Sequence, residues 1–123
     1  MNISSLFRST PVAKLPSYTS SEVSHSAKKF INALRGVKNT AETKGCKVSN
    51  MYQKTENYAT KLAKSAEKGN IKDTLKNISK LQKHSDDLFS ATGNPFTRSA
   101  IAAAKMERSN IASALLNNKL SLR

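Results

Sequence analysis

The 123-residue sequence has little of several residue types that particular classes of protein require. A single cysteine, Cys46, excludes an intramolecular disulfide framework and a multi-cysteine zinc site. The two histidines, His25 and His84, lie far apart in the sequence and form no metal-binding motif. No apolar run approaches the ~18–20 residues that span a bilayer, and the N-terminus lacks the apolar core of a cleaved signal peptide. We therefore expect no metal site, no cofactor and no membrane-spanning helix.

Acidic residues are also scarce, because 8 Asp and Glu stand against 21 Lys and Arg, which gives a formal net charge of +13. The apolar fraction of 37% is below the usual ~45–50%, and tryptophan is absent. This composition predicts one domain with a small core built from helices. The positive charge favours anionic partners: nucleic acid, an acidic protein or an anionic membrane surface.

Residues 1–21, MNISSLFRSTPVAKLPSYTSS, differ in composition from the rest of the chain. Eight of them are Ser or Thr, and none is acidic. Pro11 and Pro16 each fix φ and lack a backbone donor, so no stable helix crosses them. We expect residues 1–21 to be a disordered N-terminal segment and residues 22–123 to form a basic helical bundle.

From Ser20 onward, apolar residues recur at spacings of three and four, which is typical of helices with one apolar face. Ser20 or Ser21 can cap the first of these helices. The spacing keeps the same phase past Gly45, which favours one continuous helix over a hairpin, although glycine costs ~1 kcal/mol inside a helix. The apolar positions are Val23, Ala27, Phe30, Leu34, Val37, Ala41, Val48, Met51, Thr55, Tyr58 and Leu62.

The stretches EKGN (67–70) and TGNP (92–95) indicate two further helix ends, because Gly69 and Gly93 suit a positive φ. Asn94 is predicted to cap the last helix, with Pro95 at its first position. No segment shows the two-residue alternation of a half-buried strand. The sequence therefore predicts an all-α bundle of three or four helices. The residues predicted to be buried in its core are Phe30, Leu34, Leu62, Leu75, Ile78 and Ile111.

Lysines recur every three or four residues on both sides of EKGN. On one helix they would form a single basic stripe, and across a hairpin they would line two neighbouring edges. Two interpretations are open: the solvated face of amphipathic helices, or an anion-binding surface that contacts phosphates or lipid head groups and releases counterions. Few arginines and no helix-turn-helix pattern argue against sequence-specific DNA binding. The seven residues are Lys61, Lys64, Lys68, Lys72, Lys76, Lys80 and Lys83.

The N-terminal segment resembles the export signals of bacterial type III-secreted effectors, which are unfolded, rich in Ser and Thr, and poor in acidic residues. The stretch LQKHSDDLFSATGNPFTRSAI (81–101) resembles the region that leads into the catalytic arginine of a family of helical-bundle type III effectors. ASALLN (112–117) is similar to a stretch beyond that arginine. The family acts as GTPase-activating proteins on host Rho GTPases. The resemblance implies that Arg98, five residues after Gly93, is an arginine finger that stabilises charge on the transferred phosphoryl group.

The residues themselves favour a binding protein over an enzyme, because no Gly-rich phosphate loop and no paired catalytic carboxylates are present. Together with the resemblance, they favour a virulence effector that passes from the bacterial cytoplasm into a host cell through a type III system. We expect it to bind a host protein, such as a small GTPase, or an anionic surface, and before export a secretion chaperone. We expect no small-molecule substrate. The alternatives are a basic helical protein that binds nucleic acid or a membrane surface, and a component or chaperone of the secretion apparatus.

Overall fold

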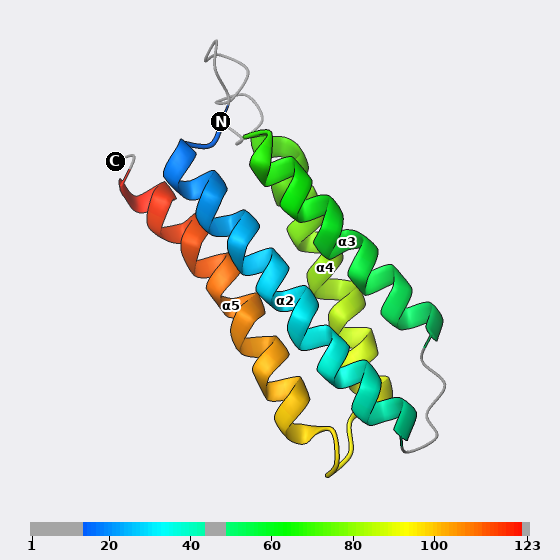
Figure 1. Cartoon of the computed structure of the whole chain (residues 1–123). Helices are drawn as coiled ribbons and strands as arrows, with labels where there is room; N and C mark the ends of the chain where they lie inside the picture. The colour runs from blue at the N-terminus through cyan, green and yellow to red at the C-terminus, as the bar shows by residue number, and fades with distance from the viewer. Residues whose placement is uncertain (1–13, 44–48, 122–123) are drawn as a thin grey trace.

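The computed structural model describes residues 14–43 and 49–121, and these residues form an all-α bundle (Figure 1). Consecutive helices run in opposite directions (Figure 1). The helices in the described residues are α2 (Ser17–Thr43), α3 (Ser49–Glu67), α4 (Ile71–Thr92) and α5 (Arg98–Ser121). Helix α2 packs against both α3 and α5, and α3 also packs against α4. The all-α fold class predicted from the sequence is confirmed.

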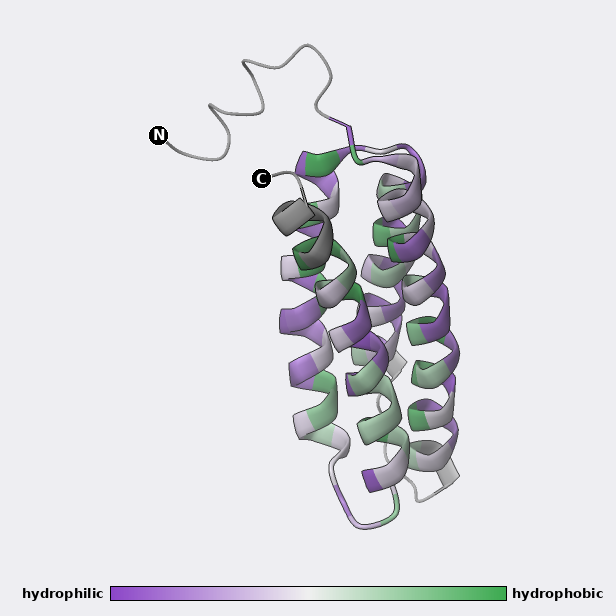
Figure 2. Cartoon of the chain, turned by 90° about the vertical axis from the view of Figure 1, so that its left-hand side faces the viewer, coloured by the Kyte–Doolittle hydropathy of each residue, from purple (hydrophilic) through white to green (hydrophobic). Residues whose placement is uncertain are grey.

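Helix α2 supplies a large part of the core, and like α3 it packs against two neighbouring helices. Figure 2 shows hydrophobic and hydrophilic stretches alternating along the helices, as expected for helices with one buried face. The apolar face predicted for α2 is confirmed in full. Its fully buried residues are Val23, Ala27, Phe30, Leu34, Val37 and Ala41.

The first turn of α2 begins at Ser17, earlier than the cap predicted at Ser20 or Ser21. Residues 17–21 are therefore helical, and their assignment to a disordered segment is wrong. The carbonyl of Pro16 accepts a hydrogen bond from the Ser20 N–H at 2.9 Å, a role that requires no N–H from the proline. Just before it, the Leu15 N–H donates to the Gly69 carbonyl at 2.8 Å. The disorder predicted for residues 1–13 lies outside the described residues.

Helices α2 and α3 are separate, so the continuous helix favoured by the sequence pattern is wrong. Gly45 itself lies outside the described residues, as does Val48. The buried face of α3 follows the predicted phase at Thr55 and Leu62, which are fully buried, but departs from it at Met51, which is 42% exposed beside the buried Tyr52. Near the start of α3, the inward face is therefore set by the packing of the hairpin and not by the phase of the preceding helix. The buried residues of α3 are Tyr52, Thr55, Ala59, Leu62, Ala63, Ser65 and Ala66.

The turn between α3 and α4 follows the prediction. Gly69 adopts a φ of +72°, the left-handed conformation that ends many helices. The Asn70 side chain then caps α4, because its Oδ1 accepts a hydrogen bond from the Asp73 N–H at 2.9 Å. This turn reverses the chain between the two lysine-bearing helices.

The inner face of α4 differs from the prediction at one position. Leu75 is 42% exposed, so its assignment to the core is wrong, and Ile78 is only partly buried. The adjacent Thr74 is fully buried instead, and its hydroxyl donates to the Ser65 Oγ at 3.3 Å. A hydroxyl that forms a hydrogen bond can be buried at little cost in free energy. The spacing of apolar residues therefore could not show that Thr74 is the buried residue at this point of α4. The predictions confirmed as buried are Phe30, Leu34, Leu62 and Ile111.

The loop between α4 and α5 departs from the prediction at both of its ends. Gly93 has a φ of −65°, so the predicted positive φ is wrong, and α5 begins at Arg98 and not at Pro95. Asn94 caps the loop turn itself, because its Oδ1 accepts hydrogen bonds from the backbone N–H groups of Phe96 at 2.8 Å and Thr97 at 3.0 Å. The buried Thr97 hydroxyl also donates to the Thr92 carbonyl at 2.6 Å. These bonds hold the chain in a turn that delays the start of α5.

Candidate functional site

The seven predicted lysines are all exposed, six of them on the outer faces of α3 and α4 and one, Lys68, directly after the end of α3. On each helix they are three or four residues apart, so they share one face of that helix. Because the chain reverses at Gly69, they form two stripes on neighbouring helices and not one stripe on a single helix. We call these residues the lysine surface: Lys61 and Lys64 on α3, Lys68 in the turn, and Lys72, Lys76, Lys80 and Lys83 on α4.

Within the described part of the chain, no carboxylate forms an ion pair with a residue of the lysine surface. The ion pairs found there join other residues, Lys28 to Glu67 at 2.9 Å and Arg108 to Asp86 at 2.6 Å. The Lys61 ammonium lies 5.2 Å from the centre of the Tyr58 ring, an uncharged partner. None of the seven ammonium groups is therefore held in a direct ion pair with a described carboxylate, although Lys64 still interacts with the charge of Glu67 over a longer distance.

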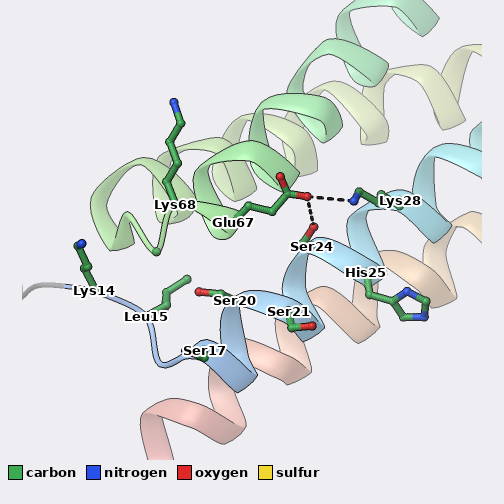
Figure 3. Close-up of a pocket in the computed structure, with 11 residues that line it drawn as sticks. Lys14, Leu15, Ser17, Ser20, Ser21, Ser24, His25, Lys28, Glu67 and Lys68 are labelled. Atoms are coloured by element: carbon green, nitrogen blue, oxygen red, sulfur yellow. Dashed lines mark hydrogen bonds and ion pairs between the residues drawn. The ribbon is translucent and has the colours of Figure 1, made fainter.

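A shallow hollow of about 610 Å³ adjoins the lysine surface at the α3–α4 turn (Figure 3). It lies between the first turns of α2 and the end of α3, and we call it the serine hollow. In Figure 3, Lys14 and Lys68 extend away from the serines, so the two ammonium groups do not converge on one point. The residues that line it are Lys14, Leu15, Ser17, Ser20, Ser21, Ser24, His25, Lys28, Glu67, Lys68 and Gly69.

The carboxylate of Glu67 is engaged within the serine hollow. One of its oxygens accepts hydrogen bonds from the Ser24 hydroxyl at 2.8 Å and from the Lys28 ammonium at 2.9 Å (Figure 3). The hydrogen bond from Lys28, followed by that from Ser24, lowers the pKa of Glu67 below its ordinary value. The carboxylate is exposed, so this pair contributes little to stability. Because Glu67 is already paired, it does not compensate Lys14 or Lys68.

The serine hollow offers hydroxyl groups, ammonium groups and one imidazole to a ligand. His25 forms no hydrogen bond with any of the hollow's serines, which are described throughout, so no nucleophile is paired with a base. This hollow was not predicted from the sequence, because the start of α2 was expected at Ser20 or Ser21 and not at Ser17. With a helix from Ser17, the spacing of Ser17, Ser20, Ser21 and Ser24 puts them on one face, a signal that was readable in the sequence.

Arg98 is exposed and is the first residue of α5. It borders a second hollow, of about 680 Å³, between α4 and α5. Among the described residues it has no hydrogen-bond or ion-pair partner. The loop that carries Arg98 lies at the opposite end of α4 from Lys72, so the structure does not bring Arg98 together with the α3–α4 turn.

In the described ranges, 14–43 and 49–121, no cluster of three or more His, Cys, Asp or Glu residues has a geometry that could hold a metal ion. None of the helices in those ranges combines the length and apolar character needed to cross a membrane. Comparison of the chain with protein-family models, curated proteins and solved structures found no match.

Proposed function

We propose that this protein is a type III-secreted effector that binds an acidic protein or an anionic surface of a host cell through the lysine surface. The observation that carries the proposal is the exposure of seven lysines without a carboxylate partner among the described residues. A protein with a net charge of +13 and such a surface attracts anions over distances comparable to the Debye length. Binding of this kind requires neither a metal nor a cofactor.

Charge reversal tests the lysine surface directly. Replacing Lys72, Lys76 and Lys80 by Glu is expected to lower the affinity for phosphatidylserine vesicles by roughly 100-fold or more, since each lysine near such a membrane contributes ~1 kcal/mol. Helicity should be retained, because Lys and Glu have similar helix propensities. Vesicle co-sedimentation measures the affinity, and circular dichroism measures the helicity. The affinity of the unmodified protein should also fall steeply as salt is added.

The matched control reverses Lys29, Arg98 and Lys105, exposed residues of α2 and α5, and has the same net charge as the test variant. It should lose much less affinity if the lysine surface is the binding site. Equal losses in the two variants would mean that only total charge matters. Retained binding after reversal of Lys72, Lys76 and Lys80 would leave the lysines as a solvated face. Tighter binding to RNA or duplex DNA than to the vesicles would favour the alternative of a nucleic-acid-binding protein.

Export through a type III system is the second part of the proposal, and it is supported by the resemblance of residues 1–21 to effector signals. A reporter enzyme fused to residues 1–21 is expected to enter host cells in a contact-dependent manner. A fusion to residues 22–42, a helical segment of equal length, is the control and should stay in the bacterium. Equal retention of both fusions would remove the secretion proposal but would not affect the binding role of the lysine surface.

A Rho GTPase-activating role is a second candidate function, and the exposure of Arg98 is the observation that favours it. An arginine finger must reach the nucleotide site of another protein, which requires a side chain that is accessible and not held by neighbours. Arg98 meets both conditions among the described residues. Measurement of GTP hydrolysis by purified Rho-type GTPases tests this role.

A further inference from the structure

The seam between α4 and α5 is the open side of the bundle. The pairs α2–α5, α2–α3 and α3–α4 pack closely, whereas the backbones of α4 and α5 approach each other at few points. Two hollows lie along this seam. One, of about 680 Å³, lies next to Arg98 and has Phe89 and Ile101 in its lining, and the other, of about 160 Å³, lies between Ile78 and Ala112.

Arg108 crosses the seam between the two hollows. Its guanidinium donates to the Ser85 hydroxyl at 2.7 Å and to the Asp86 carboxylate at 2.6 Å, and it lies 5.6 Å from the centre of the Phe89 ring. These contacts join α4 to α5 at mid-length and occupy the carboxylate of Asp86. The hydrogen bonds of Arg108 therefore bridge the seam at mid-length, with one hollow on either side of them.

Beyond the bridge, Ile78 lines the smaller hollow, and helical spacing places further apolar residues on the same faces of α4 and α5. Ile71, Leu75 and Ile78 are four and three residues apart and share one face of α4. Leu116 follows Ala112 by one turn of α5, so it continues the face that lines the smaller hollow. Leu75 is 42% exposed and Leu116 is 57% exposed, so this strip is left partly uncovered in the bundle.

The charge beside the seam is positive. Arg98 and Lys105 line the larger hollow, and the Lys105 ammonium lies 5.9 Å from the centre of the Phe89 ring. The acidic residue of that hollow, Asp86, is already paired with Arg108. A ligand that complements the seam must therefore combine an apolar surface with negative charge at its edges.

We propose that the α4–α5 seam binds an amphipathic helix of a partner protein whose apolar face is flanked by acidic residues. A 22-residue helix such as α4 is about 33 Å long, which accommodates an 18-residue partner helix of about 27 Å. Charge disfavours two other occupants. A second copy of the chain carries the same net charge of +13, and residues 1–13 contain Arg8 and no acidic residue. This inference goes beyond the proposed function, because Leu75, Leu116 and Lys105 are not part of the lysine surface.

A synthetic 18-residue peptide provides the probe. It carries Leu and Ile at positions three and four apart, with Glu at the flanking positions and a fluorophore at one end. We expect the full-length protein to bind it, as measured by fluorescence anisotropy. Leu75→Gln and Leu116→Gln should each weaken binding by roughly tenfold or more, the scale of interface hot spots. Both positions are exposed in α4 and α5, so the fold should be retained, and thermal melting by circular dichroism verifies this.

Met106→Gln is the matched control, because Met106 is a 67% exposed apolar residue of α5 that lines neither hollow. It should leave the affinity for the peptide unchanged. A second peptide has the same apolar positions flanked by Lys, and it should bind at least tenfold more weakly than the Glu-flanked peptide. The two peptides are also tested on protein that has first been saturated with phosphatidylserine vesicles, which should occupy only the lysine surface. An unchanged affinity for the Glu-flanked peptide then shows that this peptide binds at the seam and not at the lysine surface.

Several outcomes would overturn the proposal. One is unchanged binding in both Leu75→Gln and Leu116→Gln. Another is equal affinity for the Glu-flanked and Lys-flanked peptides. A dimer seen by analytical ultracentrifugation that disappears in Leu75→Gln would identify a second copy as the occupant. An affinity at least tenfold higher after deletion of residues 1–13 would identify that segment as the occupant. None of these outcomes bears on vesicle binding by the lysine surface.

Discussion

Replacing Leu34 by Ala is expected to lower the free energy of unfolding by about 2–5 kcal/mol. Leu34 lies in the middle of α2 and is fully buried. Because α2 packs against both α3 and α5, a cavity at this position weakens the contacts of the helix that holds the bundle together. Domains of this size are stable by about 5–15 kcal/mol, so the substitution removes a large part of the total.

Urea unfolding followed by circular dichroism measures the effect of Leu34→Ala. Leu75→Ala is the matched control, since it makes the same chemical change at a position that is 42% exposed. We expect the control to cost clearly less than Leu34→Ala, because 42% of Leu75 already contacts water in the folded protein, so the substitution removes less buried apolar surface. Similar losses at both positions would contradict the assignment of Leu34 to the core and of Leu75 to the surface.

If Arg98 is an arginine finger, Arg98→Lys is expected to lower stimulated GTP hydrolysis by ~10³-fold or more. A lysine retains the charge but lacks the planar guanidinium that donates two hydrogen bonds to phosphate oxygens. The melting temperature should not change, because Arg98 is exposed and has no ion-pair partner among the described residues. Its position in the first turn of α5, at the positive end of the helix dipole, gives the cation no stabilising role in the fold.

The assay uses purified Rho-type GTPases with this protein in excess. Arg35→Lys is the matched control, because Arg35 is an exposed arginine on a different helix, α2. Stimulation that is retained in Arg35→Lys and lost in Arg98→Lys would assign the finger. An unmodified protein that gives no stimulation over the intrinsic rate would eliminate the GTPase-activating role, and Arg98 would then be a contact of the α4–α5 seam.

Several features of this protein follow from the sequence by itself, because they depend on interactions within one helix or one turn. The apolar face of α2 is predictable because side chains three and four residues apart share one side of a helix. Gly69 and Asn70 mark the α3–α4 turn, since a positive φ and a side-chain cap are local requirements. The exposure of the seven lysines also follows, because burial of an unpaired ammonium is costly.

Other features were decided only by the tertiary structure, because they depend on which helix packs against which. The sequence pattern runs in one phase past Gly45, yet the α2–α3 hairpin turns Tyr52 inward and leaves Met51 exposed. Thr74 is buried in place of Leu75 because Ser65, on the neighbouring helix, provides a partner for its hydroxyl. The hydrogen bond from Leu15 to Gly69 fixes the chain just before α2.

The candidate sites show the same division. The identity of the basic residues was readable from the sequence, but their arrangement in two stripes depends on the reversal of the chain at Gly69. The serine hollow and the open α4–α5 seam each combine residues that are far apart in the sequence and come from two helices. Periodicity states which residues share a face of one helix. It does not state how far apart two helices pack, and that separation creates the hollows.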